Sequence, residues 1–241
     1  MILCGGLGTR LRPAVPEFPK CLAPVGDRPF LEYVLAQLRG AGIRNVTLCV
    51  GYRSEQVAEY FERGDRWEMS LSYSFEKQPL GTAGALKKAE SLVCTDPFLV
   101  LNGDSILDMD LKEMVAFHKH RAALATIALA SVDSPERYGN VRTNEAGLVT
   151  RFIEKQPRAR TSVALLEGAA RINGGAYVFD RAIFREIPAG PAPVSLESDV
   201  FPRLTSGRLF GFPSDGYFVD IGVPEDYARA QRELPRRFFP C

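Results

Sequence analysis

Short apolar runs alternate with helical patterns along the first part of the chain. The apolar runs predict strands, and the segments between them, where apolar residues recur every three or four positions, predict helices. The expected strands cover residues 2–4, 46–50, 71–75 and 98–104, and the expected helices cover residues 28–42, 54–63 and 81–93. Strands that alternate with helices in this way form a parallel sheet with helices on both faces. The first half is therefore predicted to be a doubly wound α/β unit.

The pattern changes after Asp104. A helix is expected over residues 111–121, strands over 123–132, 172–180 and 208–213, a hairpin over 140–155, and a terminal helix from Pro224. The hairpin is expected because two strand-like runs flank a turn signal at residues 144–147. We therefore expect a single mixed-sheet domain over residues 1–241, with halves over about 1–110 and about 111–241.

The charge balance and the cysteine content exclude several classes of protein. The formal net charge of +1 gives no overall field for nucleic acid or an anionic membrane, and no apolar run approaches the roughly 18 residues of a membrane span. The 5 cysteines lack metal-pair spacing and are expected to be reduced thiols of a cytoplasmic protein. The two histidines, His118 and His120, are expected on a solvated helix face, which leaves little for a histidine-based metal site or triad.

The opening stretch "MILCGGLGTRLRP" places a glycine-rich loop directly after the first strand. A dinucleotide-binding loop would need a glycine where Leu11 stands, and the Gly-Lys-Ser/Thr of a P-loop is missing as well. The glycines allow backbone N–H groups to approach a phosphate, and Arg10 can bind it through two hydrogen bonds. The loop alone supports equally well a plain glycine turn followed by surface arginines.

A second motif, "FPKCLAPVGDRP", follows the loop and contains Lys20. Together the two motifs resemble the sugar-phosphate nucleotidyltransferase family, whose members join a nucleoside triphosphate to a sugar 1-phosphate and release pyrophosphate. The family usually has proline where this chain has Cys21, a change expected to have only a small conformational effect. The resemblance implies a Rossmann-like, doubly wound mixed β-sheet of the nucleotide-diphospho-sugar transferase type, similar to GT-A folds, in a single α/β domain.

The resemblance covers nearly the full chain and implies a nucleotide site in the first half. It implies catalytic roles for Arg10, Lys20 and Asp104, and nucleotide contacts from Leu3, Gly5, Gly6, Gly8, Thr9, Glu76, Pro79, Gly81, Thr82, Asn102 and Gly103. Glu76 stands where thymidylyl- and uridylyltransferases tend to have glutamine. A carboxylate only accepts hydrogen bonds, so Glu76 suits the N1–H and N2–H₂ donors of guanine. The alternative for Glu76 is a solvated loop acid.

The resemblance also implies a metal site and a sugar-phosphate site. Asp104, at the carboxyl end of a buried strand, and Asp220, far down the chain, would together hold Mg²⁺. The sugar 1-phosphate would contact Tyr138, Gly139, Glu154, Lys155, Asn173, Gly174 and Glu197. Gln156 interrupts the usual Glu-Lys-Pro order after Lys155. Glu197 is equally well explained as an acid in the first turn of a helix capped by Ser195.

The implied chemistry needs no general base, because a sugar 1-phosphate loses its second proton with a pKa of about 6 and is mostly dianionic at neutral pH. Several motifs, among them "PLGTAGAL" and "FVDIGVPEDYARAQ", resemble the D-glycero-α-D-manno-heptose 1-phosphate guanylyltransferases, which make GDP-heptose for bacterial surface polysaccharide. GTP and this sugar phosphate are then the expected partners. Mannose 1-phosphate guanylyltransferase, a uridylyltransferase and a silent nucleotide-binding regulatory subunit remain alternatives. A homodimer stays open, since the tail over residues 236–241 would suit a neighbour or its own domain.

Overall fold

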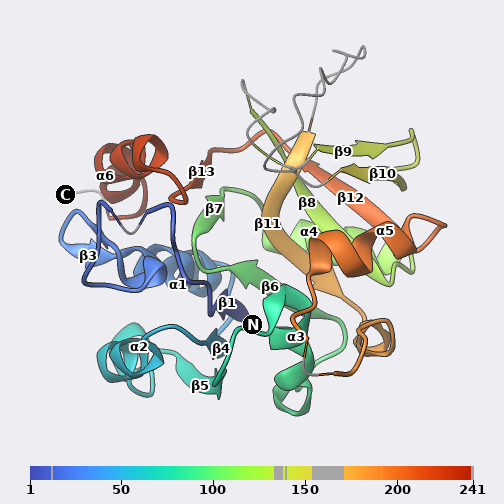
Figure 1. The fold of residues 1–241 in the computed structure, drawn as a ribbon. Coiled ribbons are helices and arrows are strands. Elements are labelled where there is room, and N and C mark those ends of the chain that lie inside the picture. Colours follow the sequence, from blue (N-terminus) through green and yellow to red (C-terminus); the bar gives the residue numbers. More distant parts are fainter. Residues whose placement is uncertain (12, 133–137, 139, 154–170, 191, 240–241) are drawn as a thin grey trace.

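One mixed sheet of nine strands runs through the described part of the molecule, a computed structural model that covers residues 1–241 except 12, 133–137, 139, 154–170, 191 and 240–241 (Figure 1). The strand order is β10-β9-β11-β6-β1-β4-β5, with β8 paired to β11 and β12 paired to β8. This mixed sheet with helices around it confirms the expected fold class.

The first half is parallel, as its alternating pattern predicted. β1 (Ile2–Cys4) pairs in parallel with both β4 (Asn45–Val50) and β6 (Phe98–Asn102), and β5 (Ser70–Phe75) pairs in parallel with β4. The connecting helices are α1 (Phe30–Gly40), α2 (Ser54–Phe61) and α3 (Gly81–Lys88). The third helix is shorter than expected, because a separate 3₁₀ turn covers Glu90–Leu92.

The second half joins the first through antiparallel pairing of β11 (Arg171–Phe179) with β6. The other elements of this half are α4 (Leu111–His120), β8 (Ala125–Ser131), β9 (Asn140–Thr143), β10 (Val149–Ile153), α5 (Phe201–Leu204), β12 (Leu209–Ser214) and α6 (Pro224–Phe238). β9 and β10 form the expected antiparallel hairpin, and Gly147 has the positive φ of 80° that its turn requires.

Two short antiparallel ribbons lie outside the large sheet, and their pairing was not predicted from the sequence. β7 (Ser105–Leu107) pairs with β13 (Phe218–Asp220), and β2 (Pro24–Val25) pairs with β3 (Arg28–Pro29). Segments as short as these carry too little pattern to predict which other segment they pair with. The first ribbon matters for the site, because it sets Asp220 opposite Ser105 and therefore beside Asp104.

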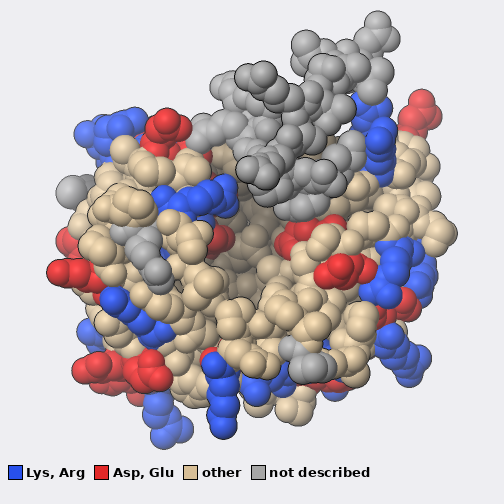
Figure 2. Space-filling view, in the orientation of Figure 1, with Lys and Arg blue, Asp and Glu red and all other residues tan. Residues whose placement is uncertain are grey.

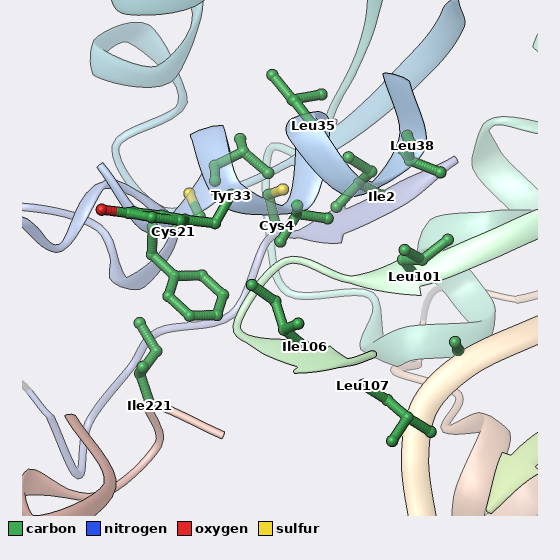
Figure 3. Close-up of a cluster of buried hydrophobic side chains, with 14 of the residues drawn as sticks. Ile2, Cys4, Cys21, Tyr33, Leu35, Leu38, Leu101, Ile106, Leu107 and Ile221 are labelled. Carbon is green, nitrogen blue, oxygen red and sulfur yellow. The ribbon is translucent and has the colours of Figure 1, made fainter. Parts of the chain in front are cut away.

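The core lies on both faces of the sheet, as alternate residues of β11 show. Ala176 and Val178 pack into the cluster that contains residues of α1 and α6, and Tyr177 and Phe179 pack into the cluster that contains residues of α3 and α5. Figure 3 shows the first cluster, where Tyr33, Leu35 and Leu38 lie among residues that include Ile2 and Leu101. Burial on both faces explains the nearly continuous apolar character of the central strands.

The expectation for the histidines was wrong for His118. Its side chain is buried and its Nδ1 lies 2.9 Å from the Thr126 hydroxyl of β8, whereas His120 is exposed. His118 shares a helix face with Leu111 and Met114, which are also buried, because residues three and four positions apart lie on one side of a helix. Burial lowers the pKa of His118, so the neutral ring is favoured.

The last described residues pack on their own domain. The rings of Phe238 and Phe239 lie edge-on to Tyr33, with centroid distances of 5.8 and 5.3 Å. The guanidinium of Arg28 lies over the Phe239 ring at 4.4 Å. Within the described residues, no helix is long and apolar enough to cross a membrane.

Candidate active site

A cleft with two adjoining cavities lies beside the glycine loop, in the hollowed face shown in Figure 2. The Lys20 cavity, of about 160 Å³, is lined by Leu3, Cys4, Gly6, Gly8, Thr9, Arg10, Lys20, Cys21, Gly103, Asp104 and Gly222. The Glu76 cavity, of about 240 Å³, is lined by Leu3, Gly5, Gly6, Leu7, Glu76, Pro79, Leu80, Gly81, Thr82, Ala85, Asn102 and Asp104. Leu3, Gly6 and Asp104 line both cavities, so a single ligand could extend through the two.

The cleft gathers every residue that the sequence analysis assigned to catalysis or to nucleotide binding. Most of them come from β1 and the loop after it, the segment between β5 and the start of α3, and the end of β6 with the residues that follow it, and Lys20 comes from the 3₁₀ turn Lys20–Leu22. The β1, β5 and β6 segments lie at the carboxyl edge of the parallel strands. Open α/β sheets bind their ligands at this edge. The assigned roles themselves stay predictions.

Glycine is required at two points of the loop for different reasons. A Cβ at Gly5 would lie 2.5 Å from Oε1 of Glu76, so a side chain there would displace that carboxylate from its position against the loop. Gly8 has a φ of +59°, and a Cβ there would lie 3.2 Å from the Cβ of Lys20. The loop therefore fits closely between Glu76 on one side and Lys20 on the other.

Lys20 joins the two aspartates across long distances in the sequence. Its Nζ donates to Oδ2 of Asp104 at 2.6 Å and to Oδ1 of Asp220 at 3.1 Å. The Lys20 side chain is only 11% exposed. Burial lowers the pKa of the Lys20 ammonium, but the two carboxylates outweigh this effect and the net pKa is raised. Lys20 is therefore fully charged and held between the aspartates.

Asp220 is the more buried of the two carboxylates. Burial raises its pKa, Lys20 opposes that rise, and Asp104 adds to it. Oδ1 of Asp220 also accepts a hydrogen bond from the backbone N–H of Gly222 at 2.7 Å. A Cβ at Gly222 would lie 2.9 Å from Nζ of Lys20, so this glycine leaves room for the ammonium.

The two aspartates suit a magnesium ion that is shared with a phosphate ligand. The described residues contain no group of three or more His, Cys, Asp or Glu side chains able to hold a metal by themselves. Mg²⁺, however, is usually held by one or two carboxylates together with substrate phosphates and waters. Asp104 and Asp220 already converge on one cation, the Lys20 ammonium, so their position fits the predicted role.

Glu76, which lines the second cavity, has one carboxylate oxygen without a hydrogen-bond partner among the described residues. Its Oε2 accepts a hydrogen bond from the Leu80 N–H at 3.2 Å, whereas Oε1 is buried and has no partner among the described residues. Burial raises the pKa of this carboxyl group. Oδ1 of Asn102, on the same cavity, is buried and unpartnered in the described part too. Buried acceptors are nearly always paired, so each of these two atoms calls for a donor that the described residues do not supply.

The Glu197 cluster, formed by Thr82, Ser195, Glu197, Tyr177 and Asn173, is saturated by contrast. Oε2 of Glu197 accepts from the hydroxyls of Thr82 and Ser195, at 2.7 Å each, and Oε1 accepts from Tyr177 at 3.5 Å. Nδ2 of Asn173 donates to the Tyr177 hydroxyl at 2.9 Å. This cluster ties the start of α3 to the second half of the chain.

Ser195 caps the turn that carries Glu197, as one of the two explanations for Glu197 predicted. Its hydroxyl accepts from the N–H groups of Glu197 and Ser198, at 3.1 and 3.2 Å. Oδ1 of Asn173 likewise has a partner in its own strand, the N–H of Gly175 at 3.0 Å. The sugar contacts predicted for Glu197 and Asn173 stay predictions, and both side chains have structural roles.

The other predicted sugar contacts are placed by the structure or fall outside it. A Cβ at Gly174 would lie 2.7 Å from Leu107, so close packing explains why glycine stands at this position. The Tyr138 hydroxyl donates to Oδ2 of Asp226 at 3.1 Å. Gly139, Glu154 and Lys155 lie outside the described residues.

Sequence reasoning missed several residues that line the two cavities: Cys4, Leu7, Leu80, Ala85, Cys21 and Gly222. Gly222 is the only one of these with a detectable signal, a glycine placed two residues after Asp220. Cys21, where the family usually has proline, is buried beside Cys4, and their contact helps to raise the pKa of the Cys4 thiol. The four described cysteines are free thiols.

Comparison with known proteins matches the chain as a whole to a family of enzymes. Residues 1–237 match the family model described as nucleotidyl transferase. The chain is 40% identical over 236 residues to D-glycero-alpha-D-manno-heptose 1-phosphate guanylyltransferase of Aneurinibacillus thermoaerophilus, with 97% of each chain covered. It is 39% identical over 232 residues to mannose-1-phosphate guanylyltransferase catalytic subunit beta of Xenopus tropicalis, covering 94% of this chain and 62% of that protein.

A solved structure gives the same result at the level of the fold. HddC from Yersinia pseudotuberculosis, complexed with GMP-PN, superimposes with a TM-score of 0.81 and 29% identity, and 97% of each chain is covered.

Proposed function

The chain belongs to the nucleotidyl transferase family, and we propose that it transfers the GMP group of GTP to D-glycero-α-D-manno-heptose 1-phosphate, releasing pyrophosphate and GDP-heptose. The observation that carries this proposal is the unpaired Oε1 of Glu76, which lies against the glycine loop beside the Lys20–Asp104–Asp220 group. The residue proposed to select guanine and the residues proposed to act on the triphosphate then lie in one cleft. The 40% identical relative with this activity supports the choice of sugar.

Guanine fits the Glu76 cavity for a chemical reason. Its Watson–Crick edge carries two adjacent donors, N1–H and N2–H₂, whereas uracil and thymine present one N–H between two carbonyl groups. The carboxylate of Glu76 is acceptor-only and already uses Oε2 on the Leu80 N–H. A guanine N–H bound to Oε1 would satisfy the one acceptor that the protein leaves without a partner.

The transfer itself depends on charge and position. The sugar phosphate is mostly dianionic at neutral pH, so one of its oxygens can attack the α-phosphorus of GTP while the bond to pyrophosphate breaks. Arg10 and Lys20 would stabilise the negative charge on the departing pyrophosphate, and the loop N–H groups would bind its oxygens. Asp104 and Asp220 would hold Mg²⁺, which supplies positive charge beside the reacting phosphates when it is bound.

The second half of the chain would hold the sugar 1-phosphate in this scheme. Glu154 would accept hydrogen bonds from sugar hydroxyls, and Lys155 would neutralise the attacking phosphate. We further propose that the enzyme works in the cytoplasm, where GTP is available and free thiols persist. There it would serve the synthesis of a bacterial surface polysaccharide. That the enzyme forms a homodimer remains a prediction.

A grid of substrates tests the proposal directly. Pyrophosphate release is measured with GTP, ATP, CTP, UTP and dTTP against the heptose and mannose 1-phosphates, with Mg²⁺ present. We expect the highest kcat/KM for GTP with the heptose. Preference for UTP or dTTP would overturn the role of Glu76, and no release with any pair would favour a silent nucleotide-binding subunit.

Mannose 1-phosphate is the second candidate acceptor. The 39% identity to a mannose-1-phosphate guanylyltransferase subunit favours it, although the chain spans only 62% of that protein. The two sugars differ by one exocyclic carbon with its hydroxyl. The mannose column of the grid therefore separates these candidates.

A further inference from the structure

Lys20 occupies the place in which the proposed function puts a metal ion. Its ammonium lies 2.6 Å from Oδ2 of Asp104 and 3.1 Å from Oδ1 of Asp220, and it comes from a 3₁₀ turn far from both in sequence. No other cation of the described residues forms an ion pair with either carboxylate. The aspartates therefore have their counter-charge before any ligand is present.

A divalent cation and Lys20 would compete for these carboxylates. Under the proposed function Asp104 and Asp220 hold the metal together, and each directs an oxygen at Nζ of Lys20. Oδ1 of Asp220 also serves the Gly222 N–H at 2.7 Å, which limits its remaining capacity. Two cations held a few ångströms apart in a partly buried site repel each other. The metal can be bound well only after the ammonium has moved away.

The glycine loop gives the ammonium another place to go. The stem of Lys20 is fixed beside Gly8, where a Cβ would lie 3.2 Å from the Cβ of Lys20. The same cavity is lined by Gly6, Thr9 and Arg10, the groups expected to meet the phosphates. A lysine carries a compact charge on a flexible four-carbon chain, so Nζ can turn from the aspartates to a phosphate while the stem stays in place.

We propose that Lys20 is a placeholder cation, which closes the metal site of the free enzyme and opens it when a triphosphate offers the ammonium a new partner. This inference rests on the proposed function for the identity of the ligands. It assigns Lys20 a role before the chemistry begins, in addition to charge stabilisation during it. Metal alone then binds weakly to the free enzyme.

Nucleotide-free metal binding tests the proposal. Mn²⁺ is titrated into the enzyme without nucleotide, and free Mn²⁺ is followed by electron paramagnetic resonance. We expect Lys20→Met to bind Mn²⁺ at least about tenfold more tightly than the wild type, a typical size for a coupling between two sites. Lys20→Arg keeps the positive charge and should remain at the wild-type affinity. Lys112→Met, an exposed lysine of α4, is the matched control and should not change it.

Thermal unfolding provides a second measurement on the same proteins. Without metal, Lys20→Met leaves the two carboxylates facing each other, so its Tm should fall below that of the wild type and rise again with Mn²⁺. Lys20→Gln takes its place if Lys20→Met does not fold. Equal Mn²⁺ affinity for the wild type and the neutral variant would overturn the proposal. The proposal would also be overturned if Lys20→Arg bound Mn²⁺ as tightly as the neutral variant.

The proposed function can fail separately from this inference. Pyrophosphate release by the wild-type enzyme tests the function, whereas Mn²⁺ binding without nucleotide tests the placeholder. A wild type that is inactive on every substrate pair, together with tighter Mn²⁺ binding by Lys20→Met, would reject the function and keep the placeholder. A wild type that is active, together with a Mn²⁺ affinity that is unchanged in Lys20→Met, would keep the function and reject the placeholder.

Discussion

The Glu197 cluster and the Glu76 cavity are both polar, and they differ in what their polar atoms bind. In the Glu197 cluster, carboxylate, hydroxyl and amide groups bind one another, with hydrogen bonds from Thr82, Ser195 and Tyr177 to the single carboxylate. In the Glu76 cavity, Oε1 of Glu76 and Oδ1 of Asn102 are buried without a partner among the described residues. The first arrangement stabilises the fold, and the second is suited to a ligand.

The energetic cost of an unpaired buried acceptor explains why the difference between the Glu197 cluster and the Glu76 cavity is informative. A buried acceptor without a hydrogen bond costs about 1–3 kcal/mol, so a fold keeps one only where something else compensates. The Lys20–Asp104–Asp220 group carries a similar cost, because one ammonium serves two carboxylates, and burial, together with the charge of Asp104, raises the pKa of Asp220. Variants in the two regions should therefore affect different measurements.

Asp104→Asn should give the largest effect and should act on turnover. We expect pyrophosphate release to fall at least about a hundredfold, the scale seen when one preorganised stabiliser of charge is lost. The free energy of unfolding should change little, because removal of one carboxylate also removes its repulsion with Asp220. Asp108→Asn, an exposed aspartate four residues away, is the control. Near-normal release by Asp104→Asn would remove Asp104 from the catalytic group.

Glu76→Gln should give the next largest effect and should act on base selection. The amide keeps one acceptor but adds an N–H₂ donor, which cannot satisfy the donors of guanine at the position of Oε1. We expect kcat/KM for GTP to fall about tenfold to a hundredfold relative to UTP, in keeping with the cost of about 1–3 kcal/mol for leaving a buried polar group unpaired. The measurement is the ratio of initial rates with the two nucleotides. An unchanged ratio would make Glu76 a loop acid without a role in selection.

Ser195→Ala should act on stability and leave turnover nearly unchanged. The variant loses the cap over Glu197 and Ser198 and one of the hydrogen bonds to Oε2 of Glu197. Loss of a serine cap typically costs about 1 kcal/mol, which urea unfolding detects. Ser198→Ala, an exposed serine of the same turn, is the control. A large fall in kcat/KM at unchanged stability would place the Glu197 cluster in the substrate site.

The sequence was sufficient for the parts of the fold that carry a periodic pattern. The parallel strands and the hairpin were predicted because their apolar runs are local signals. The β7–β13 ribbon was missed, and with it the physical reason why Asp104 and Asp220 meet, since pairing between positions so far apart leaves no local signal. The family resemblance supplied that pairing, and the structure confirms that the two residues lie together.

The sequence indicated part of the lining of the candidate site, whereas the roles of these residues stay predictions and most of their contacts could not be foreseen. The residues assigned to the nucleotide line one cleft, but no pattern could show that Lys20 already holds both aspartates or that Oε1 of Glu76 is unpaired. Such facts depend on side-chain placement across the fold. The same limit applies to His118, which sequence reasoning placed in solvent because charged neighbours surround it.

His118 should give the smallest effect, through the dependence of stability on pH. Like the polar groups of the Glu197 cluster, the His118 ring already has a partner within the fold, because it pairs with Thr126 inside the core. Burial lowers its pKa below the ordinary value of 6.5, with Asp180 and Asp96 opposing that shift. Between 6.5 and the lowered folded pKa the unfolded chain binds more protons, so stability falls as pH decreases through this window. The linkage slope for one group is at most about 1.4 kcal/mol per pH unit.

Urea unfolding between pH 5 and pH 8 measures this contribution, with pH values chosen to span the ordinary histidine range. In His118→Gln the part of the slope due to this ring should disappear, while the exposed His120→Gln should retain it. Turnover at neutral pH should be unaffected in both variants, because the proposed reaction needs no histidine. An identical slope in His118→Gln and wild type would mean that the buried ring keeps an ordinary pKa, and that its pairing with Thr126 tolerates the charged form.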